Sequence, residues 1–189
     1  ISYLRTDSTR ISEEADAAAR TYISEQYGQN YVSQTEKTVK NGQKIQDAHE
    51  AIRPTDITRT PVLVKESLTR DQFRLYQLIW RRFAASRMAP ARYETTSVKI
   101  GAGEYVFTVA ASKVAFDGFM SVYTEEGDDK KGNILSQSLE KGMELKLKEL
   151  KPEQHFTQPP AHYTEASLVK TMEELGIGRP STYAPTITT

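Results

Sequence analysis

Residues 69–90 read TRDQFRLYQLIWRRFAASRMAP, and the elements on either side are organised around this stretch. Thr69 and Gln72 have the spacing of a capping box, in which side chains and backbone N–H groups of the first turn satisfy one another. Pro90 lacks the N–H that a continuing helix needs. The stretch therefore predicts a helix over residues 69–88, with an apolar face at helical spacing made of Phe73, Tyr76, Ile79, Trp80, Phe83 and Ala84.

After Pro90 the apolar residues change to a period of two, which is typical of strands. In the last such stretch, Met143, Leu145 and Leu147 alternate with charged residues. The charged run 125–132 predicts a loop. We therefore expect four strands, over residues 94–100, 104–116, 118–123 and 143–150.

Upstream of the central helix, Ser12 is a suitable N-cap for a helix that extends to about Gln26, and Gly28 is suited to end it. The polar stretch 29–45 contains Asn41-Gly42, which predicts a turn between two possible strands. Residues 46–52 could form a helical turn, which the following Pro54 would stop.

Towards the end of the sequence we expect a helix over 164–175, ended by Gly176. A further helix would be capped by Ser181 or Thr182. The order of elements is a helical unit, an antiparallel sheet and the start of a second helical unit. This order predicts an α+β fold.

Length and composition limit the class of protein. At 189 residues, the chain is long enough for one large domain or two small ones. It has no cysteine, which excludes disulfides and cysteine-bound metals, and no apolar run long enough to span a bilayer. It begins at Ile1 without an initiator Met, so we expect a piece excised from a longer protein.

The 25 basic and 25 acidic side chains give a net charge of zero. This balance argues mildly against nucleic-acid binding, which usually shows a basic excess. However, residues 70–92 hold six arginines and a single acidic residue, Asp71. A basic stripe of this kind permits a phosphate-binding face, although a solvated helix face is the commoner outcome.

Tyr3 and Arg5 lie two positions apart, in what the pattern predicts to be the end of a short strand. Residues i and i+2 of a strand point to the same face, so the two side chains could address one phosphate. A tyrosine oxygen can act as a nucleophile, and an arginine offers a planar fork of donors to phosphoryl oxygens. On composition alone, however, a tyrosine in a strand is far more often a packing residue. The residues that follow, Asp7, Ser8 and Thr9, are expected to form turns and caps.

Three strings of residues carry a family resemblance. The first is SYLRTDST at residues 2–9, and the second is DAHEAIRPT at residues 47–55. The third runs from PPAHYTEASLV at 159–169 to GIGRPSTYA at 176–184. In content and order, they resemble strings of the type IA DNA topoisomerases, in the bacterial topoisomerase I branch. Leu4 favours this branch over topoisomerase III, which tends to have proline there, and reverse gyrase is a further alternative.

The resemblance implies a toroidal enzyme in which a helical domain with the tyrosine sits on a β-rich arch around a hole for duplex DNA. By this likeness, residues 1–89 are most of the helical tyrosine domain. Residues 90–158 are part of the antiparallel β-rich arch domain. Residues 159–189 begin a helical domain that binds single-stranded DNA.

The resemblance also assigns roles at the tyrosine. Tyr3 would attack a DNA phosphodiester, forming a 5′-phosphotyrosine and releasing a 3′-hydroxyl, while Arg5 contacts the scissile phosphate. His49 would support DNA binding near the tyrosine, and Arg53 is a candidate phosphate contact. For Glu50, pairing with a nearby arginine is a sufficient role.

Arg179 and Thr182 lie just before a predicted helix start, where backbone N–H groups and hydroxyls can hold a phosphate. From the residues alone, a capping turn with a solvated arginine is an equal alternative. The resemblance favours contact with single-stranded DNA by both residues.

The function implied is ATP-independent relaxation of negatively supercoiled DNA through transient single-strand cleavage and religation. The acidic, Mg²⁺-binding N-terminal domain of the same polypeptide has no counterpart in this sequence, so we expect no metal ligands in this chain and no activity from it alone. The partner would be a single-stranded segment of supercoiled DNA, in the cytoplasm with the nucleoid and without a membrane. The alternative from another class is a non-catalytic DNA-binding module of the same fold.

Overall fold

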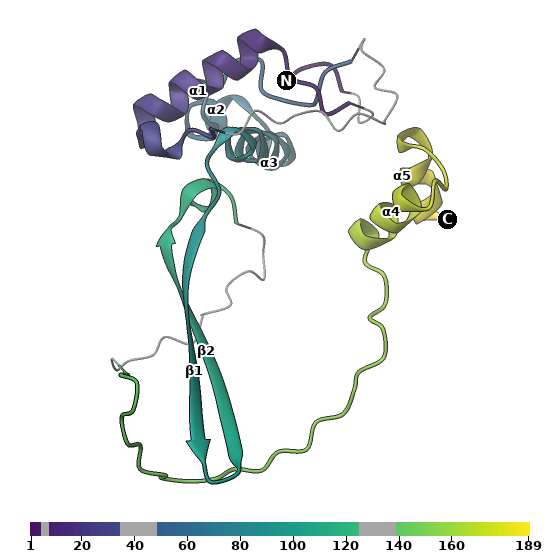
Figure 1. The fold of residues 1–189 in the computed structure, drawn as a ribbon. Helices are drawn as coiled ribbons and strands as arrows, with labels where there is room; N and C mark the ends of the chain where they lie inside the picture. The colour runs from purple at the N-terminus through teal and green to yellow at the C-terminus, as the bar shows by residue number, and fades with distance from the viewer. Residues whose placement is uncertain (5–7, 35–48, 125–138) are drawn as a thin grey trace. The chain divides into compact units, whose positions relative to one another are not determined.

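The computed structural model describes residues 1–4, 8–34, 49–124 and 139–189. The chain divides into two compact units, Ile1–Ser136 and Gln137–Thr189. Figure 1 labels the α-helices and strands of both units. The first unit contains α1 (Glu13–Tyr27), η1 (Gln29–Tyr31), α2 (Pro61–Val64), η2 (Lys65–Ser67), α3 (Arg70–Arg87), β1 (Arg92–Ala102), β2 (Tyr105–Phe116) and η3 (Gly118–Ser121). The second unit contains α4 (Glu165–Glu174) and α5 (Pro180–Thr188).

The three long helices predicted from the sequence are present, and the caps expected for the first two are confirmed. The Ser12 hydroxyl accepts the Ala15 N–H at the start of α1. At the start of α3, Thr69 and Gln72 form the capping box, since each side chain accepts the backbone N–H of the other residue. Thr164 likewise caps α4 by accepting the Ser167 N–H.

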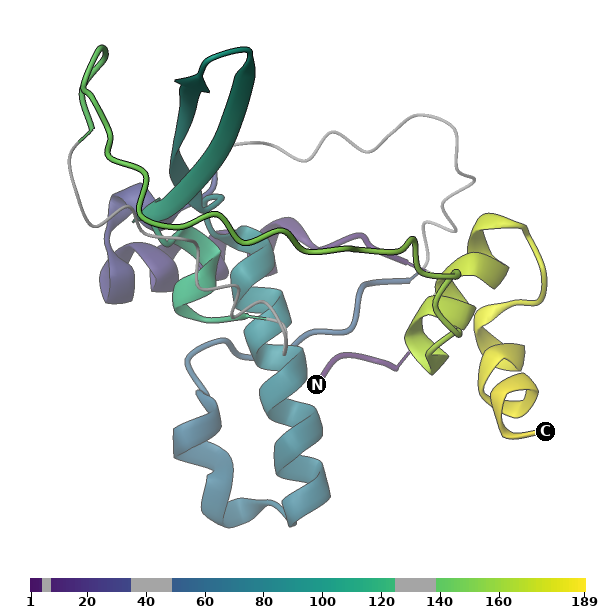
Figure 2. The same ribbon diagram turned by 90° about the horizontal axis from the view of Figure 1, so that it is seen from below.

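The core of the first unit lies where α1, α3 and the segment before α2 meet. Figure 2 shows α3 as the long helix, with α2 beside its N-terminal half. Trp80 of α3 is 5 % exposed and donates its indole N–H to the Ile57 carbonyl at 2.8 Å, while the Tyr22 ring of α1 meets it edge to face. Burying an aromatic ring with its N–H satisfied is favourable, so this tryptophan links both helices to residue 57. The buried members of this core are Ala15, Ala19, Ile57, Trp80, Phe83 and Ala84.

An ion-pair network fixes α1 against the end of α3. Asp16 receives Arg87 at 2.8 Å and Arg20 at 2.5 Å. Burial raises the pKa of the Asp16 carboxyl, but the hydrogen bonds and charges of Arg87 and Arg20 outweigh burial, and the net pKa is lowered. The carboxylate therefore stays ionised between its two arginines at neutral pH.

Strands β1 and β2 form a two-stranded antiparallel sheet with Val98 opposite Val109. Gly103, with φ of +62°, follows β1 in a two-residue connection, which is the place where a type II′ hairpin turn uses glycine. At the other end, the Tyr31 hydroxyl donates to Asp117 at 2.7 Å, and its ring packs on Phe116. The hairpin is thus joined at its base to the helical part of the unit.

Two of the four predicted strands are wrong. Residues 118–123 form η3 and its end, because Gly118 adopts a φ of +50° and the Phe119 N–H then bonds to the Ala89 carbonyl instead of a neighbouring strand. An added Cβ at Gly118 would clash with the carbonyl oxygens of Ala89 and Pro90. Residues 143–150 are irregular despite their alternation, since within the described residues no strand pairs with them, and an alternating pattern needs a partner.

Three further predictions concern the segments between α1 and α2 and after η3. The described part of the polar stretch 29–45 begins with η1, whereas Asn41-Gly42 lies outside the described residues, as does the loop expected over 125–132. The helical turn expected over 46–52 is wrong for residues 49–52, which have no helical structure.

In the second unit, α4 and α5 lie side by side in Figures 1 and 2. The Ile177 N–H bonds to the Met172 carbonyl and so ends α4 in a tight turn. The last helix begins two or three residues earlier than expected, with Arg179 as N-cap and Pro180 at the first helical position. Proline suits that position because its fixed φ is already helical and the N–H that it lacks has no partner there in any helix.

Candidate active site at the tyrosine segment

The segment that carries Tyr3 lies against residues 49–53, so the first two sequence strings of the resemblance meet in space. The Ser2 N–H donates to the Arg53 carbonyl at 2.8 Å, and the Arg53 N–H donates to the Ser2 hydroxyl at 2.9 Å. The same hydroxyl donates to the Ala51 carbonyl at 3.0 Å. Three hydrogen bonds thus anchor the residue that directly precedes Tyr3.

A second set of bonds anchors the chain beyond Tyr3. The Ser8 side chain, 9 % exposed, donates its hydroxyl to the His49 carbonyl at 2.7 Å and accepts the Arg10 N–H at 3.2 Å. The Arg10 carbonyl in turn accepts the Ala51 N–H at 2.8 Å. Residues 2 and 10 therefore both contact Ala51, so the chain is held to the 49–53 segment before and after Tyr3.

Glu50 joins this assembly to the start of α1. Its Oε1 accepts the Ser12 backbone N–H at 2.6 Å, and its Oε2 accepts an Arg53 guanidinium N–H at 3.0 Å. The pairing of Glu50 with a nearby arginine, expected from the sequence, is confirmed. Because Ser12 is the N-cap of α1, the carboxylate also lies at the positive end of that helix.

The charge state of Glu50 follows from these contacts. Burial raises the pKa of its carboxyl, but the hydrogen bonds from Ser12 and Arg53 and the Arg53 charge outweigh burial, so the net pKa is lowered. Glu50 is consequently ionised at neutral pH and acts as an acceptor only. It is suited to holding the backbone in place and not to donating a proton.

The Tyr3 side chain is 77 % exposed, whereas the backbone on either side of it is anchored. The short strand expected here is not formed in residues 1–4; instead, Ser2 makes its bonds through one hydroxyl and one N–H rather than through a regular ladder. A phenol in this position is open to a large substrate. Arg5, the second predicted catalytic residue, lies outside the described residues.

The Arg53 side chain forms hydrogen bonds within the protein. Its guanidinium donates to Glu50 and to the Pro54 carbonyl, at 3.0 and 3.1 Å, and its side chain is 16 % exposed. His49 is half-buried, and its carbonyl accepts the Ser8 hydroxyl. A phosphate contact by Arg53 and a DNA-binding role for His49 stay predictions, and for Arg53 such a contact would have to compete with two internal partners.

Arg179 and Thr182 belong to the second unit. The Thr182 hydroxyl accepts the Arg179 backbone N–H at 2.9 Å and donates to the Arg179 carbonyl at 3.0 Å. The Thr182 hydroxyl is thus used for capping, which is the alternative considered for this turn, while both residues are exposed. The expected DNA contact stays a prediction, for which Arg179 has its side chain at the surface.

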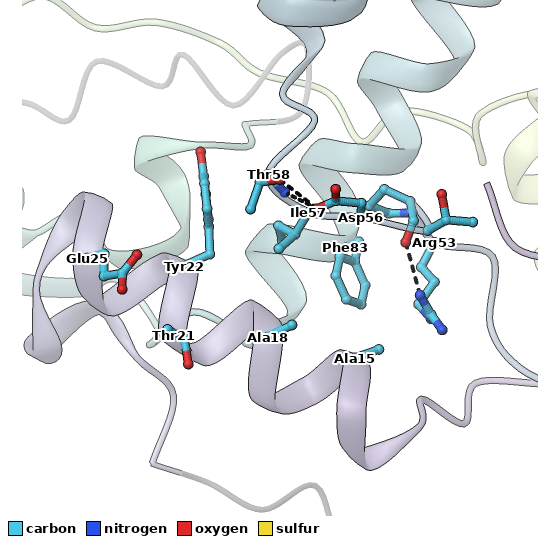
Figure 3. A pocket seen from close by; sticks show the side chains of 12 residues that line it. Ala15, Ala18, Thr21, Tyr22, Glu25, Arg53, Asp56, Ile57, Thr58 and Phe83 are labelled. Atoms are coloured by element: carbon cyan, nitrogen blue, oxygen red, sulfur yellow. Dashed lines mark hydrogen bonds between the residues drawn. The ribbon is translucent and has the colours of Figure 1, made fainter.

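A hollow of about 360 Å³ lies between α1 and residues 53–58. Figure 3 shows Arg53 reaching the Pro54 carbonyl at its edge and Asp56 bonded to Thr58, with Ala15 and Ala18 of α1 opposite. The small side chains of these alanines leave the space open. Tyr3 and His49 do not line this hollow, so it is separate from the tyrosine surface.

Neither a metal centre nor a membrane span is found in the described parts of the chain. Within residues 1–4, 8–34, 49–124 and 139–189, no group of three or more His, Asp or Glu side chains could hold a metal ion. No helix there combines the length and the apolar character needed to cross a membrane.

Sequence reasoning did not find the roles of Ser2 and Ser8 in joining the two strings. The sequence pattern predicts no role for Ser2 and only a local turn or cap for Ser8. Their partners lie 41 to 51 residues away, so no local pattern contains the signal. The one hint was that each serine lies within the first string, close to the tyrosine.

Comparison with known proteins gives the family. The family model described as "DNA topoisomerase" matches residues 1–189. The full-length topoisomerase I of Thermotoga maritima is a similar solved structure, with 40% sequence identity and a TM-score of 0.70. The match covers 98% of this chain and 29% of the Thermotoga protein, so the chain corresponds to less than a third of that length. Together with the α+β fold and the tyrosine segment, these matches show that the chain belongs to the bacterial type IA DNA topoisomerases, a family of isomerases.

Proposed function

We propose that an enzyme containing this chain relaxes negatively supercoiled DNA by cutting one strand, passing DNA through the break and resealing it. Tyr3 is the nucleophile in this proposal, and Arg5 holds the scissile phosphate. Its substrate is a single-stranded segment of the supercoiled duplex. His49, Arg179 and Thr182 are proposed to contact that strand. Arg53 stabilises the site through its bond to Glu50.

The chemistry is an exchange of one phosphoester for another. The Tyr3 phenol oxygen bonds to phosphorus, the bond from phosphorus to the 3′ oxygen breaks, and the phenolic proton is balanced by the proton that the leaving 3′-hydroxyl gains. Religation is the reverse reaction. Because the covalent link conserves the ester, no ATP is needed. Arg5 would stabilise the charge of the phosphoryl oxygens with its fork of donors.

One observation carries the proposal: an exposed tyrosine lies between Ser2 and Ser8, and both serines are hydrogen-bonded to the segment of the second family string. A packing tyrosine would be buried, whereas a nucleophile for a polymer must be reachable and held in position. The family match over the whole chain supports the same assignment.

For Mg²⁺, we propose that another domain of a longer polypeptide binds the ion. There it would supply positive charge near the phosphate. We further propose that the enzyme works in the cytoplasm, where its DNA substrate lies.

The test is Tyr3→Phe in the full-length enzyme, with Tyr105→Phe as a control that removes an exposed phenol from the hairpin. After rapid denaturation, Tyr3→Phe should show no covalent protein–DNA adduct and bind DNA within about twofold of wild type, because the ring is retained. The control should form adduct normally. Adduct formation by Tyr3→Phe would assign the nucleophile elsewhere. The 189-residue chain alone should form no adduct even with Mg²⁺.

A further inference from the structure

We infer that Ser2 and Ser8 are positioning residues for Tyr3, forming a two-serine clasp that holds the tyrosine segment, residues 2–4 and 8–10, on residues 49–53. This inference rests on the proposed role of Tyr3 as nucleophile. It assigns a function to two hydroxyls whose bonding partners are distant in sequence.

The Ser2 hydroxyl both accepts and donates a hydrogen bond. It accepts the Arg53 N–H at 2.9 Å and donates to the Ala51 carbonyl at 3.0 Å. Among small side chains, only a hydroxyl of serine or threonine can accept and donate well from the same position. Alanine at residue 2 would leave both backbone groups without these bonds, while threonine could keep both.

The backbone position of Tyr3 depends strongly on Ser2, because the two residues are direct neighbours with Cα atoms about 3.8 Å apart across the peptide bond. The Tyr3 side chain is mostly exposed, so packing contributes little to its position. The hydrogen bonds of Ser2, together with those of Ser8 and Arg10 further along the chain, therefore restrain the backbone. A nucleophile held in this way retains a free side chain on a fixed backbone.

The clasp also links the tyrosine to the second family string, residues 47–55. Ser8 bonds to the His49 carbonyl, and Ser2 to the backbone of Ala51 and Arg53. These three residues alternate along the segment, so the backbone groups that bond to Ser2 and Ser8 lie on the same edge of it. The spacing between Tyr3 and the second string is consequently set by hydroxyl-to-backbone bonds, which do not titrate near neutral pH.

The first arm of the test uses Ser2→Ala, Ser8→Ala and the conservative Ser2→Thr in the full-length enzyme. Ser97→Ala, which removes an exposed hydroxyl from β1, is the matched control. In single-turnover cleavage of a single-stranded oligonucleotide, Ser2→Ala should slow cleavage at saturating DNA by about 10-fold to 100-fold, as expected for a misplaced reacting group. The DNA concentration for half-saturation should change less than about twofold, and Ser2→Thr should restore most of the rate.

The second arm measures amide hydrogen exchange in the 189-residue chain. The Arg53 amide should exchange at least about 10-fold faster in Ser2→Ala, because its acceptor is gone, while amides within α3 should be unchanged and so report an intact fold. Ser8→Ala provides an independent variant, because it removes the second hydroxyl of the clasp.

The outcomes separate the two proposals. Cleavage at the wild-type rate in both alanine variants, with faster Arg53 exchange, would show that the clasp is structural only and would overturn the inference. Slow cleavage in Ser2→Ala with unchanged Arg53 exchange would also overturn it, since the bond would not exist in solution. Adduct formation by Tyr3→Phe would contradict the proposed function, because the nucleophile would then be another residue. The exchange measurement would still report whether the Ser2 hydroxyl bonds to the Arg53 N–H. Slow cleavage, faster exchange and threonine rescue together support the clasp.

Discussion

The tyrosine segment and the Arg179–Thr182 turn both come from sequence strings that predict phosphate contacts, yet they are built differently. At the tyrosine, the bonds join residues that are 38 to 51 positions apart. At the turn, they join residues three positions apart. A local turn forms wherever its helix forms, whereas the tyrosine segment depends on the folding of the whole first unit. Substitutions should therefore have wide effects at the first site and confined effects at the second.

The largest effect is expected at Arg5, next to the nucleophile. Arg5→Lys in the full-length enzyme should reduce relaxation by about 10²- to 10³-fold, because an ammonium cannot reproduce the bidentate fork that meets the phosphoryl oxygens. Rates of relaxation of a supercoiled plasmid measure this. Arg74→Lys, on the exposed surface of α3, is the control and should change the rate less than about twofold. Near-normal relaxation by Arg5→Lys would contradict the proposed contact between the Arg5 guanidinium and the scissile phosphate.

Glu50→Ala should lower the free energy of unfolding of the 189-residue chain by about 2–3 kcal/mol. The substitution removes a charged acceptor from the Ser12 N–H and leaves the mostly buried Arg53 without its carboxylate. Denaturant titration followed by the fluorescence of Trp80, the single tryptophan, measures it.

Glu94→Ala is the matched control, because Glu94 pairs with Lys113 at 2.8 Å on the exposed hairpin. An exposed pair contributes about 0–1 kcal/mol. Equal losses for the two variants would contradict the idea that the tyrosine region depends on long-range bonds.

Acid should weaken the first unit through Glu50 and Asp16. The pKa of each carboxyl is lowered in the folded state, so its contribution is complete above the unfolded pKa of about 4 and is lost as the pH falls through the lowered folded value. The free energy of unfolding should therefore be nearly constant from about pH 7 to pH 5 and fall below that. In Glu50→Gln and Asp16→Asn, measured by the same titration at several pH values, this fall should be smaller. An unchanged pH profile in both variants would assign the acid sensitivity to other groups.

The smallest effect is expected at Thr182. Thr182→Ala removes the acceptor for the Arg179 N–H at the start of α5, a loss of about 0.5–1 kcal/mol that is confined to this helix end. Amide exchange at Arg179 should become faster, while the Trp80 unfolding transition should not move. Thr182→Ser keeps the hydroxyl and should behave like wild type. A shift of the Trp80 transition in Thr182→Ala would show that the turn is not local.

Elements with their own start signals could be predicted from sequence. Ser12, Thr69 and Thr164 each cap the helix expected after them, because capping depends on residues within one turn. The hairpin of β1 and β2 was also predictable, since a glycine connection joins two alternating segments. Strand prediction failed for 118–123, where the Ala89 carbonyl takes the hydrogen bond of Phe119. It failed also for 143–150, which alternate but pair with no strand of the described residues.

The sequence by itself determined the family, the starts of α1 and α3 and the chemical identity of the candidate nucleophile, because these depend on residue types and short spacings. The tertiary structure alone decided that Ser2 and Ser8 bond to residues 49–53 and that Arg53 is held by Glu50. Those bonds span some forty to fifty residues or depend on how a side chain is oriented in the folded unit. Only the packing of α1 and α3 around Trp80 brings such segments together, because hydrophobic burial determines which distant backbone groups can meet.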